Sequence, residues 1–144
     1  MKRVFETSAG GIVFKKDGKQ ILWLTTKHSG YKKWTFPKGL VGDINKDEDK
    51  KEAALREVQE EGGIKAKIID EETVKVSYTY TLQNLFHIKT VYYYLMEYVS
   101  GDTANHDWEV TEAKFAPEEE LEKLLSFKSD KEAFAKIKEK LHEK

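Results

Sequence analysis

The sequence predicts an α/β/α sandwich, an α/β (α+β) fold with a mixed central sheet, as one domain over residues 1–144. Residues 86–99 carry apolar or aromatic side chains at both odd and even positions, which is typical of a strand covered on both faces. One helical segment lies in the middle of the chain, and two amphipathic helical segments lie at its end. Because sheets and helices bury their apolar faces in layers, helices are expected on both sides of the sheet.

The first half of the chain is expected to contain two strands followed by a helix. Residues 4–16 predict a strand with a break at Gly10-Gly11, and Asp17-Gly18 is a hairpin-turn signal. A second strand is expected over 20–27, followed by a loop at 28–31, a lead-in segment at 34–39 and a polar loop at 40–47. The helix is predicted over 47–61, with Asp47 or Asp49 as its N-cap and Gly62-Gly63 as its end.

The second half of the chain is expected to complete the sheet and then end in helices. Strands are predicted at 64–69, 73–82, 86–99 and 111–115, with turns or loops at 83–84 and 101–107. Amphipathic helices are predicted at 117–125 and 130–141. Pro117 suits a helix start, and Asp130 is a candidate cap for the last helix.

Composition limits the classes of function that this chain can serve. The net charge of −1 argues against an extended nucleic-acid-binding surface. The absence of cysteine excludes a disulfide framework and thiol catalysis. The N-terminus lacks the apolar stretch of a signal peptide, and no run reaches the ~18 apolar residues of a membrane span. We therefore expect a cytoplasmic protein that contacts no membrane and is a monomer or a weak dimer.

Three carboxylates lie at helical spacing in the predicted central helix. Residues three and four apart share a helix face, so Glu57, Glu60 and Glu61 are expected within one arc, away from Ala54, Leu55 and Val58. Like charges at this spacing repel one another, and a cation would remove that penalty. Carboxylate oxygens suit Mg²⁺ or Mn²⁺, so this pattern predicts either a divalent-metal site or a solvated acidic face.

The residues around this helix resemble the Nudix box of the Nudix (MutT-like) hydrolase family. The resemblance covers residues 36–64 and consists of Phe36-Pro37-Lys38-Gly39, then Glu48, then the run from Arg56 to Ile64. The family usually has five residues between the box glycine and the first glutamate. Eight residues separate Gly39 from Glu48, whereas five separate Gly42 from Glu48. We take Gly39 as the box glycine, because Phe-Pro-Lys-Gly is the usual lead-in, with about three residues added to the following loop.

The resemblance implies a role for each glutamate of the box. Glu57 and Glu61 would bind Mg²⁺ (or Mn²⁺), Glu60 would bind it directly or through water, and the Gly39 carbonyl would contribute. Arg56 is expected to be structural, paired either with Glu48 or with Glu52 one helical turn away.

The resemblance also implies a carboxylate from a later loop, which would contact metal or water and could serve as the general base. Glu109 is the first candidate for this carboxylate, and Glu112 is the alternative.

The predicted substrate contacts are two lysines and two aromatic residues. Lys38 lies where the phosphate chain should pass. A lysine on the largely apolar strand of residues 86–99, Lys89, is costly unless its stem is buried with its ammonium in water or it meets an anion. Tyr80 is the candidate for stacking on a base, whereas the other tyrosines of these strands are expected to pack. Trp34 is either a loop anchor or a base contact.

Residues 34–116 resemble, more specifically, the bacterial diadenosine polyphosphate hydrolases within the Nudix family. This resemblance implies metal-dependent asymmetric cleavage of diadenosine tetraphosphate, or a longer homologue, into ATP and AMP. Three alternatives remain open. These are a nucleoside triphosphate pyrophosphatase (including sanitation of oxidised nucleotides), an RNA 5′-pyrophosphohydrolase and a catalytically silent nucleotide-binding module.

Overall fold

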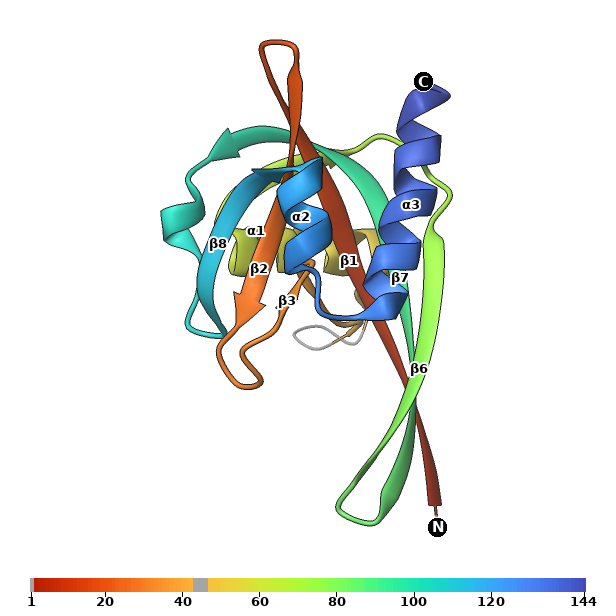
Figure 1. Cartoon of the computed structure of the whole chain (residues 1–144). Helices are drawn as coiled ribbons and strands as arrows, with labels where there is room; N and C mark the ends of the chain where they lie inside the picture. Colours follow the sequence, from red (N-terminus) through yellow and green to blue (C-terminus); the bar gives the residue numbers. More distant parts are fainter. Residues whose placement is uncertain (1, 43–46) are drawn as a thin grey trace.

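The computed structural model describes residues 2–42 and 47–144, in which a sheet carries helices on both faces (Figure 1). The strands of this described part are β1 (Lys2–Asp17), β2 (Gln20–His28), β3 (Trp34–Thr35), β4 (Lys38–Leu40), β5 (Ile64–Ile68), β6 (Val74–Leu82), β7 (Leu85–Gly101) and β8 (Val110–Pro117). The helices are α1 (Lys50–Gly62), the short 3-10 helix η1 (Thr103–Asn105), α2 (Glu118–Leu124) and α3 (Lys128–His142).

The sheet is mixed, as the sequence predicted. Its main path runs β3-β2-β1-β7-β5, while β4 pairs with β1, β6 with β7, and β8 with β2. β1 and β7 are parallel, and the remaining pairs are antiparallel. β1 therefore connects the two halves of the sheet and lies beside the short strand β4.

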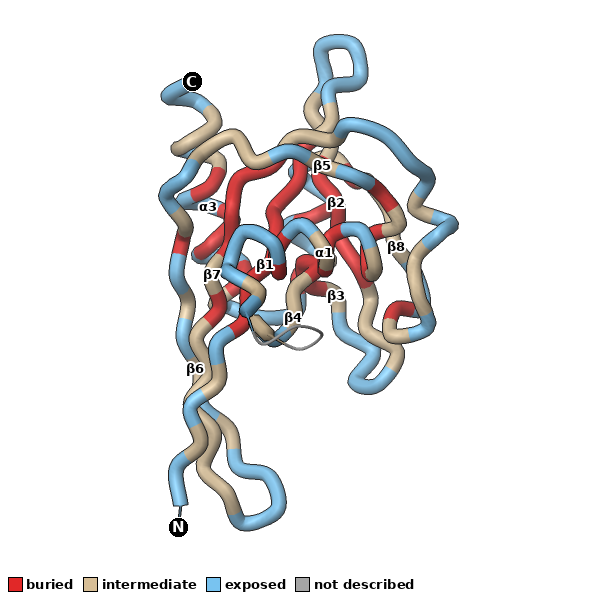
Figure 2. The backbone as a smooth tube through the Cα atoms, turned by 180° about the vertical axis from the view of Figure 1, so that it is seen from behind, coloured by how far each residue is buried: buried red, intermediate tan, exposed pale blue. Residues whose placement is uncertain are grey.

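Side chains alternate along β7 between two hydrophobic cores. Tyr93 and Leu95 pack in the core that α2 and α3 cover, whereas Tyr94 and Met96 pack in the core that α1 covers. The buried backbone in Figure 2 accordingly concentrates where β1, β2 and β7 cross the centre of the molecule. The expectation of a strand covered on both faces is confirmed.

The predicted break in the first strand is wrong. β1 pairs with β7 continuously from Lys2 to Phe14, through Gly10 and Gly11. The glycines serve close packing instead, because a Cβ on Gly10 would overlap the carbonyl oxygen of Pro37. The missing side chain lets the Pro37–Lys38 backbone lie directly against β1.

Helix α1 begins later than predicted. Asp49 is its N-cap and accepts a hydrogen bond from the Glu52 amide at 2.8 Å, so the helix starts at Lys50 and not at Asp47. Gly63 ends the helix in the left-handed conformation, at φ 77°. Leu55 was expected to be buried, but it is 37% exposed; Ala53, Ala54 and Val58 form the packed face instead.

Asp130 does not cap α3, contrary to expectation. The N-cap position is Phe127, which makes no side-chain capping hydrogen bond. Asp130 lies in the first turn of α3 and is buried. Its carboxyl group faces the sheet, where it accepts hydrogen bonds from side chains of other elements.

The β6–β7 hairpin and the start of β1 extend away from the helices as a twisted ribbon (Figures 1 and 2). Its two-residue turn, Gln83-Asn84, has φ values of 52° and 62°, which suit the tight hairpin turn predicted there. In the described part of the chain, no helix is both long and apolar enough to cross a membrane.

Candidate active site

Helix α1 turns two of the three predicted metal ligands toward the sheet. Glu57 is 4% exposed and Glu61 is 6% exposed, whereas the Glu60 side chain is 37% exposed. The expectation that all three lie on one free helix face is therefore wrong for Glu57 and Glu61. Helical spacing places the two side chains one above the other, and β4 covers them.

Strand β4 meets these carboxyl groups through its backbone. A Cβ on Gly39 would overlap the carboxyl group of Glu57, so only glycine fits there without displacing that side chain. The Lys38 amide donates a hydrogen bond to Glu61 Oε1 at 3.1 Å. The Lys38–Gly39 backbone and both glutamates thus meet at one point.

Arg56 connects the glutamates of α1 to the segment that precedes the helix. Its Nε and Nη2 donate to the two carboxylate oxygens of Glu48 at 2.7 and 3.0 Å, a bidentate pair. The pairing is therefore with Glu48 and not with Glu52. Arg56 Nη1 also donates to Glu57 at 2.7 Å and to Glu60 at 3.2 Å.

Glu48 also anchors the loop in which the family spacing differs. It accepts a hydrogen bond from the Gly42 amide at 3.1 Å, and Gly42 has φ of 81°. Gly42 therefore lies against Glu48, whereas Gly39 lies against Glu57. Residues 43–46 of this lengthened loop lie outside the described residues.

The buried carboxyl groups repel one another. Burial raises the pKa of Glu57 to about 7, although Arg56 opposes the shift, and Glu60 and Glu109 add to it. Burial and the neighbouring Glu57 raise the pKa of Glu61 to about 8, although Lys38 opposes that shift. Both shifts show that burial, with repulsion between neighbouring carboxyl groups, disfavours the charged forms here more than Arg56 and Lys38 favour them.

Glu109 approaches the same corner from the loop before β8. The Asp107 amide donates to the carbonyl oxygen of Glu60 at 2.8 Å, which joins this loop to α1. The Glu109 carbonyl accepts hydrogen bonds from the amide and the hydroxyl of Ser29, both at 2.9 Å. Glu109 lines the same cavity as Glu57 and Glu61, whereas Glu112 lies exposed in β8 and does not line it.

The donor set fits a divalent cation. Glu57, Glu61 and Glu109 supply the hard oxygen ligands that Mg²⁺ and Mn²⁺ prefer, and a cation there would favour the charged forms of the two carboxyl groups whose pKa values burial raises. Among residues 2–42 and 47–144, no three acidic or histidine side chains already converge on one point. One nitrogen of Arg56, Nη1, donates to both Glu57 and Glu60, so a guanidinium group bridges these two predicted ligands.

A cavity of about 730 Å³ opens beside these carboxylates. Lys38 and Lys89 line it, and burial together with Lys38 lowers the pKa of Lys89. The cavity thus combines acidic groups from α1 with lysines from β4 and β7. A site of this size with convergent charged groups is typical of small-molecule binding.

Two groups of aromatic rings also line the cavity. Tyr80 donates a hydrogen bond to Glu6 at 2.8 Å and stacks on His87 with ring centroids 4.6 Å apart, and Tyr78 lies beside it. The second group was not predicted from the sequence. It consists of His28, Tyr31 and Phe127, and the first two rings stack at 4.0 Å.

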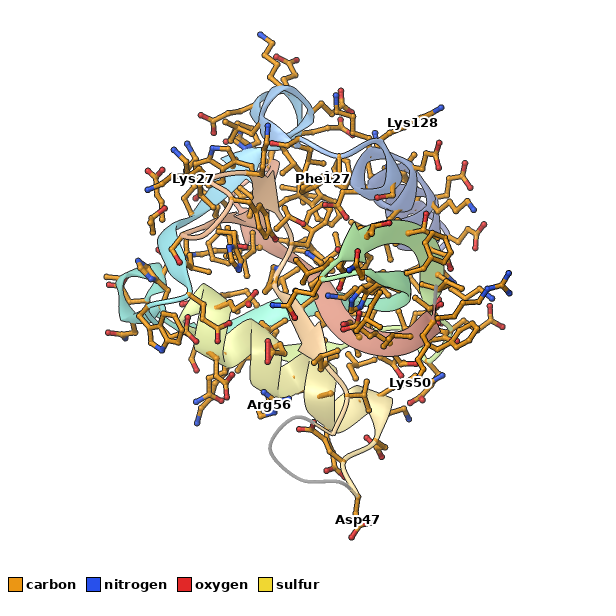
Figure 3. The ribbon with its side chains drawn as sticks, turned by 90° about the horizontal axis from the view of Figure 1, so that it is seen from below. Lys27, Asp47, Lys50, Arg56, Phe127 and Lys128 are labelled. Carbon is orange, nitrogen blue, oxygen red and sulfur yellow. The ribbon has the colours of Figure 1, made fainter. Side chains whose placement is uncertain are left out.

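The second aromatic group comes from the last residue of a strand and from two connecting segments, where no helical or strand periodicity of side chains could indicate it. His28 ends β2, Tyr31 lies in the next loop, and Phe127 precedes α3. Aromatic residues in the polar segment 28–31 were the only sequence signal for this group. Figure 3 shows Phe127 and Lys128 on the α2–α3 side of the molecule and Arg56 on the α1 side.

Trp34, a predicted base contact or loop anchor, does not line the cavity. Its amide donates a hydrogen bond to the Ser126 hydroxyl oxygen at 3.2 Å, and its carbonyl accepts one from the Ser126 amide at the same distance. Lys114 lies over its ring. Trp34 therefore anchors β3 to the connection between α2 and α3.

Comparisons with known proteins find relatives in sequence and in fold. The chain is 32% identical over 150 residues to the Mycobacterium tuberculosis (strain CDC 1551 / Oshkosh) protein named MutT4, and it spans 58% of that relative's length. A solved C. elegans Ap4A hydrolase complex superposes with a TM-score of 0.81 at 24% identity, covering 96% of this chain and 99% of that one. The NUDIX domain of Shewanella oneidensis NrtR, solved with ADP ribose, superposes with a TM-score of 0.71 at 17% identity, covering 96% and 89% of the two chains.

The family itself is defined by a match over most of the sequence. The NUDIX domain model matches residues 4–137, which include the acidic corner, both lysines and both aromatic groups. The structural neighbours support the fold, and the family match covers the range that contains α1. The chain belongs to the NUDIX domain family.

Proposed function

We propose that this protein is a Nudix hydrolase that cleaves diadenosine tetraphosphate, or a longer homologue, asymmetrically into ATP and AMP. Water would attack a phosphorus of the chain, a P–O bond would break, and the departing nucleotide would leave with its phosphate oxygen. Hydrolysis of a phosphoanhydride depends on positioning and charge stabilisation more than on covalent catalysis. The carboxylates and lysines of the cavity are suited to both tasks.

The observation that carries this proposal is the combination of two aromatic groups and two lysines in one cavity. Tyr80 and Tyr78 form one group, and Tyr31 stacked on His28 forms the other. A substrate with two bases joined by a phosphate chain would use both groups for stacking. Lys38 and Lys89 would bind the negatively charged phosphate chain that joins the two bases.

In this proposal Glu57 and Glu61 would hold Mg²⁺ or Mn²⁺ with a contribution from the Gly39 carbonyl, and Glu60, which is bound by Arg56 outside the cavity lining, would bind it through water. A bound divalent ion supplies charge stabilisation at the phosphoryl oxygens and lowers the pKa of bound water. Arg56, held by Glu48, orients Glu57. Glu109 orients the attacking water and accepts its proton.

Product analysis tests the substrate. The purified protein would be incubated with Mg²⁺ and either diadenosine polyphosphates, nucleoside triphosphates or triphosphorylated RNA, and the products separated by chromatography. Rapid formation of ATP and AMP from diadenosine tetraphosphate, with triphosphates nearly untouched, is the expected result. Glu61→Gln should lose this activity, and its matched control is Glu52→Gln, because Glu52 is exposed on the same helix and does not line the cavity.

A second candidate is hydrolysis of a single nucleoside triphosphate, including sanitation of oxidised nucleotides. It is supported by the 32% identity to a relative named as a mutator protein. Faster release of pyrophosphate from a triphosphate than cleavage of the dinucleotide would favour this candidate. Preference for RNA would favour a 5′-pyrophosphohydrolase, and binding without turnover of any substrate would indicate a nucleotide-binding module.

A further inference from the structure

A buried carboxyl group on α3, that of Asp130, contacts a side chain of β3 beside the cavity. Asp130 is 3% exposed and belongs to the cavity lining. The Thr35 hydroxyl donates to its Oδ2 at 2.5 Å, and the Tyr93 hydroxyl donates to its Oδ1 at 2.9 Å. Both carboxyl oxygens are thus used as acceptors, and neither is used by the helix cap.

The Thr35 hydroxyl has a second partner, the ammonium group of Lys38. Lys38 Nζ donates to Thr35 Oγ1 at 3.1 Å. A hydroxyl group has one proton and two lone pairs, so a Thr35 hydroxyl that donates to Asp130 is free to accept from Lys38. The three side chains form a directed chain from an ammonium donor, through a hydroxyl, to a buried carboxylate.

The backbone of Thr35 is fixed independently of this chain. Thr35 pairs with Thr26 across β3 and β2, and its carbonyl accepts from the Thr25 hydroxyl at 2.7 Å. Lys38 lies three residues further on, in β4, and its amide is bound to Glu61. The hydroxyl of Thr35 is therefore a fixed acceptor beside a long and otherwise flexible side chain.

We propose that Asp130 and Thr35 are positioning residues that hold the Lys38 ammonium at the cavity wall for the phosphate chain. The inference rests on the proposed function, since it takes Lys38 as the group that meets phosphate. A lysine side chain loses much rotamer freedom when it binds an anion, and a chain that fixes it beforehand reduces that loss. The arrangement also links α3 to strands β3 and β4.

An aspartate at position 130 suits this positioning role better than an asparagine would. Two hydroxyl groups point at its two oxygens, and an asparagine would present an amide N–H to one of them. If that N–H faced Thr35, the reversed hydroxyl would point its proton at the Lys38 ammonium, which has no acceptor to offer; if it faced Tyr93, Thr35 would keep a neutral acceptor in place of a charged one. In either orientation Asp130→Asn should weaken the hold on Lys38 even though it preserves the shape of the side chain.

The test compares two variants that each remove one hydrogen bond to Asp130. Thr35→Val removes the hydroxyl that bridges Asp130 and Lys38, whereas Tyr93→Phe removes the bond to the other carboxyl oxygen and a contact with the Thr35 hydroxyl but leaves that hydroxyl in place. Thr35→Ser restores the hydroxyl group and serves as the rescue. The first readout is the rate at which acetic anhydride labels Lys38, followed by peptide mass spectrometry, and the second is kcat/KM for diadenosine tetraphosphate.

We expect Thr35→Val and Asp130→Asn to raise Lys38 labelling several-fold and to lower kcat/KM by roughly tenfold, as loss of part of a charged hydrogen bond would. Tyr93→Phe should leave both readouts near wild type, and Thr35→Ser should restore them. In a Lys38→Ala background, Thr35→Val should have little further effect on kcat/KM.

Unchanged Lys38 labelling in Thr35→Val would overturn the inference whatever the activity. Equal effects of Thr35→Val and Tyr93→Phe would also overturn it, because they would indicate a purely structural carboxylate. If Thr35→Val raises Lys38 labelling but the wild-type protein hydrolyses no phosphoanhydride, the hydrogen-bond chain is supported and the proposed function is refuted.

Discussion

At the level of single residues, the cavity depends on how buried charge is balanced. Glu57 and Glu61 share one face of α1 and both have raised pKa values, whereas Arg56 is divided between Glu48, Glu57 and Glu60. An isolated buried carboxylate is costly, and such groups are concentrated at functional sites. A divalent ion would stabilise the charged forms of Glu57 and Glu61, which burial makes costly.

Glu61→Gln is expected to lower kcat by about 10²-fold or more, because the side chain loses the charge that would hold the cation. The fold should survive, because the change preserves shape and removes a buried charge. Steady-state kinetics with Mg²⁺ and a thermal melt of the same preparation check both statements. A collapsed melting temperature would indicate that Glu61 is a structural residue of the core.

The stability of the metal-free protein should depend on pH through the same residue. The pKa of Glu61 is raised from 4.5 to about 8, so the folded state favours the protonated form. Its contribution to stability is fully present below the unfolded pKa and is lost as pH rises toward about 8. In EDTA, Glu61→Gln should therefore gain melting temperature relative to wild type as pH rises from 5 to 8.

The addition of Mg²⁺ provides the control for this pH dependence. Mg²⁺ should raise the wild-type melting temperature more at pH 8 than at pH 5, because protons and the metal compete for the carboxylates. The effect should be smaller in Glu61→Gln. A difference between the two proteins that does not vary with pH would contradict the raised pKa.

Lys89→Ala is expected to weaken substrate binding more as the phosphate chain becomes longer. Lys89 is buried enough for its pKa to be lowered, and it lines the cavity near Lys38. The measurement is KM for dinucleotides with three, four and five phosphates, with the exposed Lys75→Ala as matched control. An equal effect on all chain lengths would count against a phosphate contact.

At the level of elements, the site depends on how closely β4 approaches α1. Gly10 lets the Pro37–Lys38 backbone lie against β1, and Gly39 leaves room for the Glu57 carboxyl group. Asp49 fixes where α1 begins, and therefore which side chains face β4. The short strand β4 thus positions backbone groups that no side chain could replace.

Gly39→Ala is expected to reduce activity while changing stability little. The added Cβ would overlap the carboxyl end of the Glu57 side chain, which can move, and not a rigid backbone. Displaced Glu57 would lose its hydrogen bond from Arg56 and its place in the cavity. Mg²⁺ titration followed by melting temperature would show a weakened metal response, and an unchanged response would contradict this role for Gly39.

At the level of the whole molecule, the hydrophobic core under α2 and α3 supports the segment that leads from β3 to β4. Phe36, next to Pro37, packs with Phe134 of α3 at 6.2 Å and with Tyr93 at 5.7 Å between ring centroids. Trp23 of β2 meets Phe134 edge-on at 5.0 Å. The lead-in to β4 is therefore held by the helix that follows it by about a hundred residues in the sequence.

Phe134→Ala is expected to destabilise the protein by about 3–5 kcal/mol, because it leaves a cavity among buried rings. Activity should fall further than unfolding alone explains, since Phe36 loses a packing partner beside Pro37. Urea denaturation and kinetics at low denaturant check this. Phe5→Ala is the matched control, because Phe5 is 74% exposed and should change stability by less than about 0.5 kcal/mol.

The sequence by itself determined the features that depend on short stretches of chain. Alternation along residues 86–99 indicated a strand covered on both faces, and the caps and spacing of the central helix indicated its type and approximate bounds. The run from Arg56 to Ile64 indicated the family. These signals are local, because helical and strand periodicities are properties of neighbouring residues.

Only the tertiary structure decided which side chains share the cavity and which are buried. Glu57 and Glu61 became buried because β4 covers them, and Trp34 was excluded because it binds Ser126. Tyr31 entered the cavity from a connecting loop, and Asp130 entered it from the first turn of α3, where a helix cap had been expected. Burial and pKa depend on contacts between residues far apart in the sequence, and these contacts leave no periodic signal in the chain.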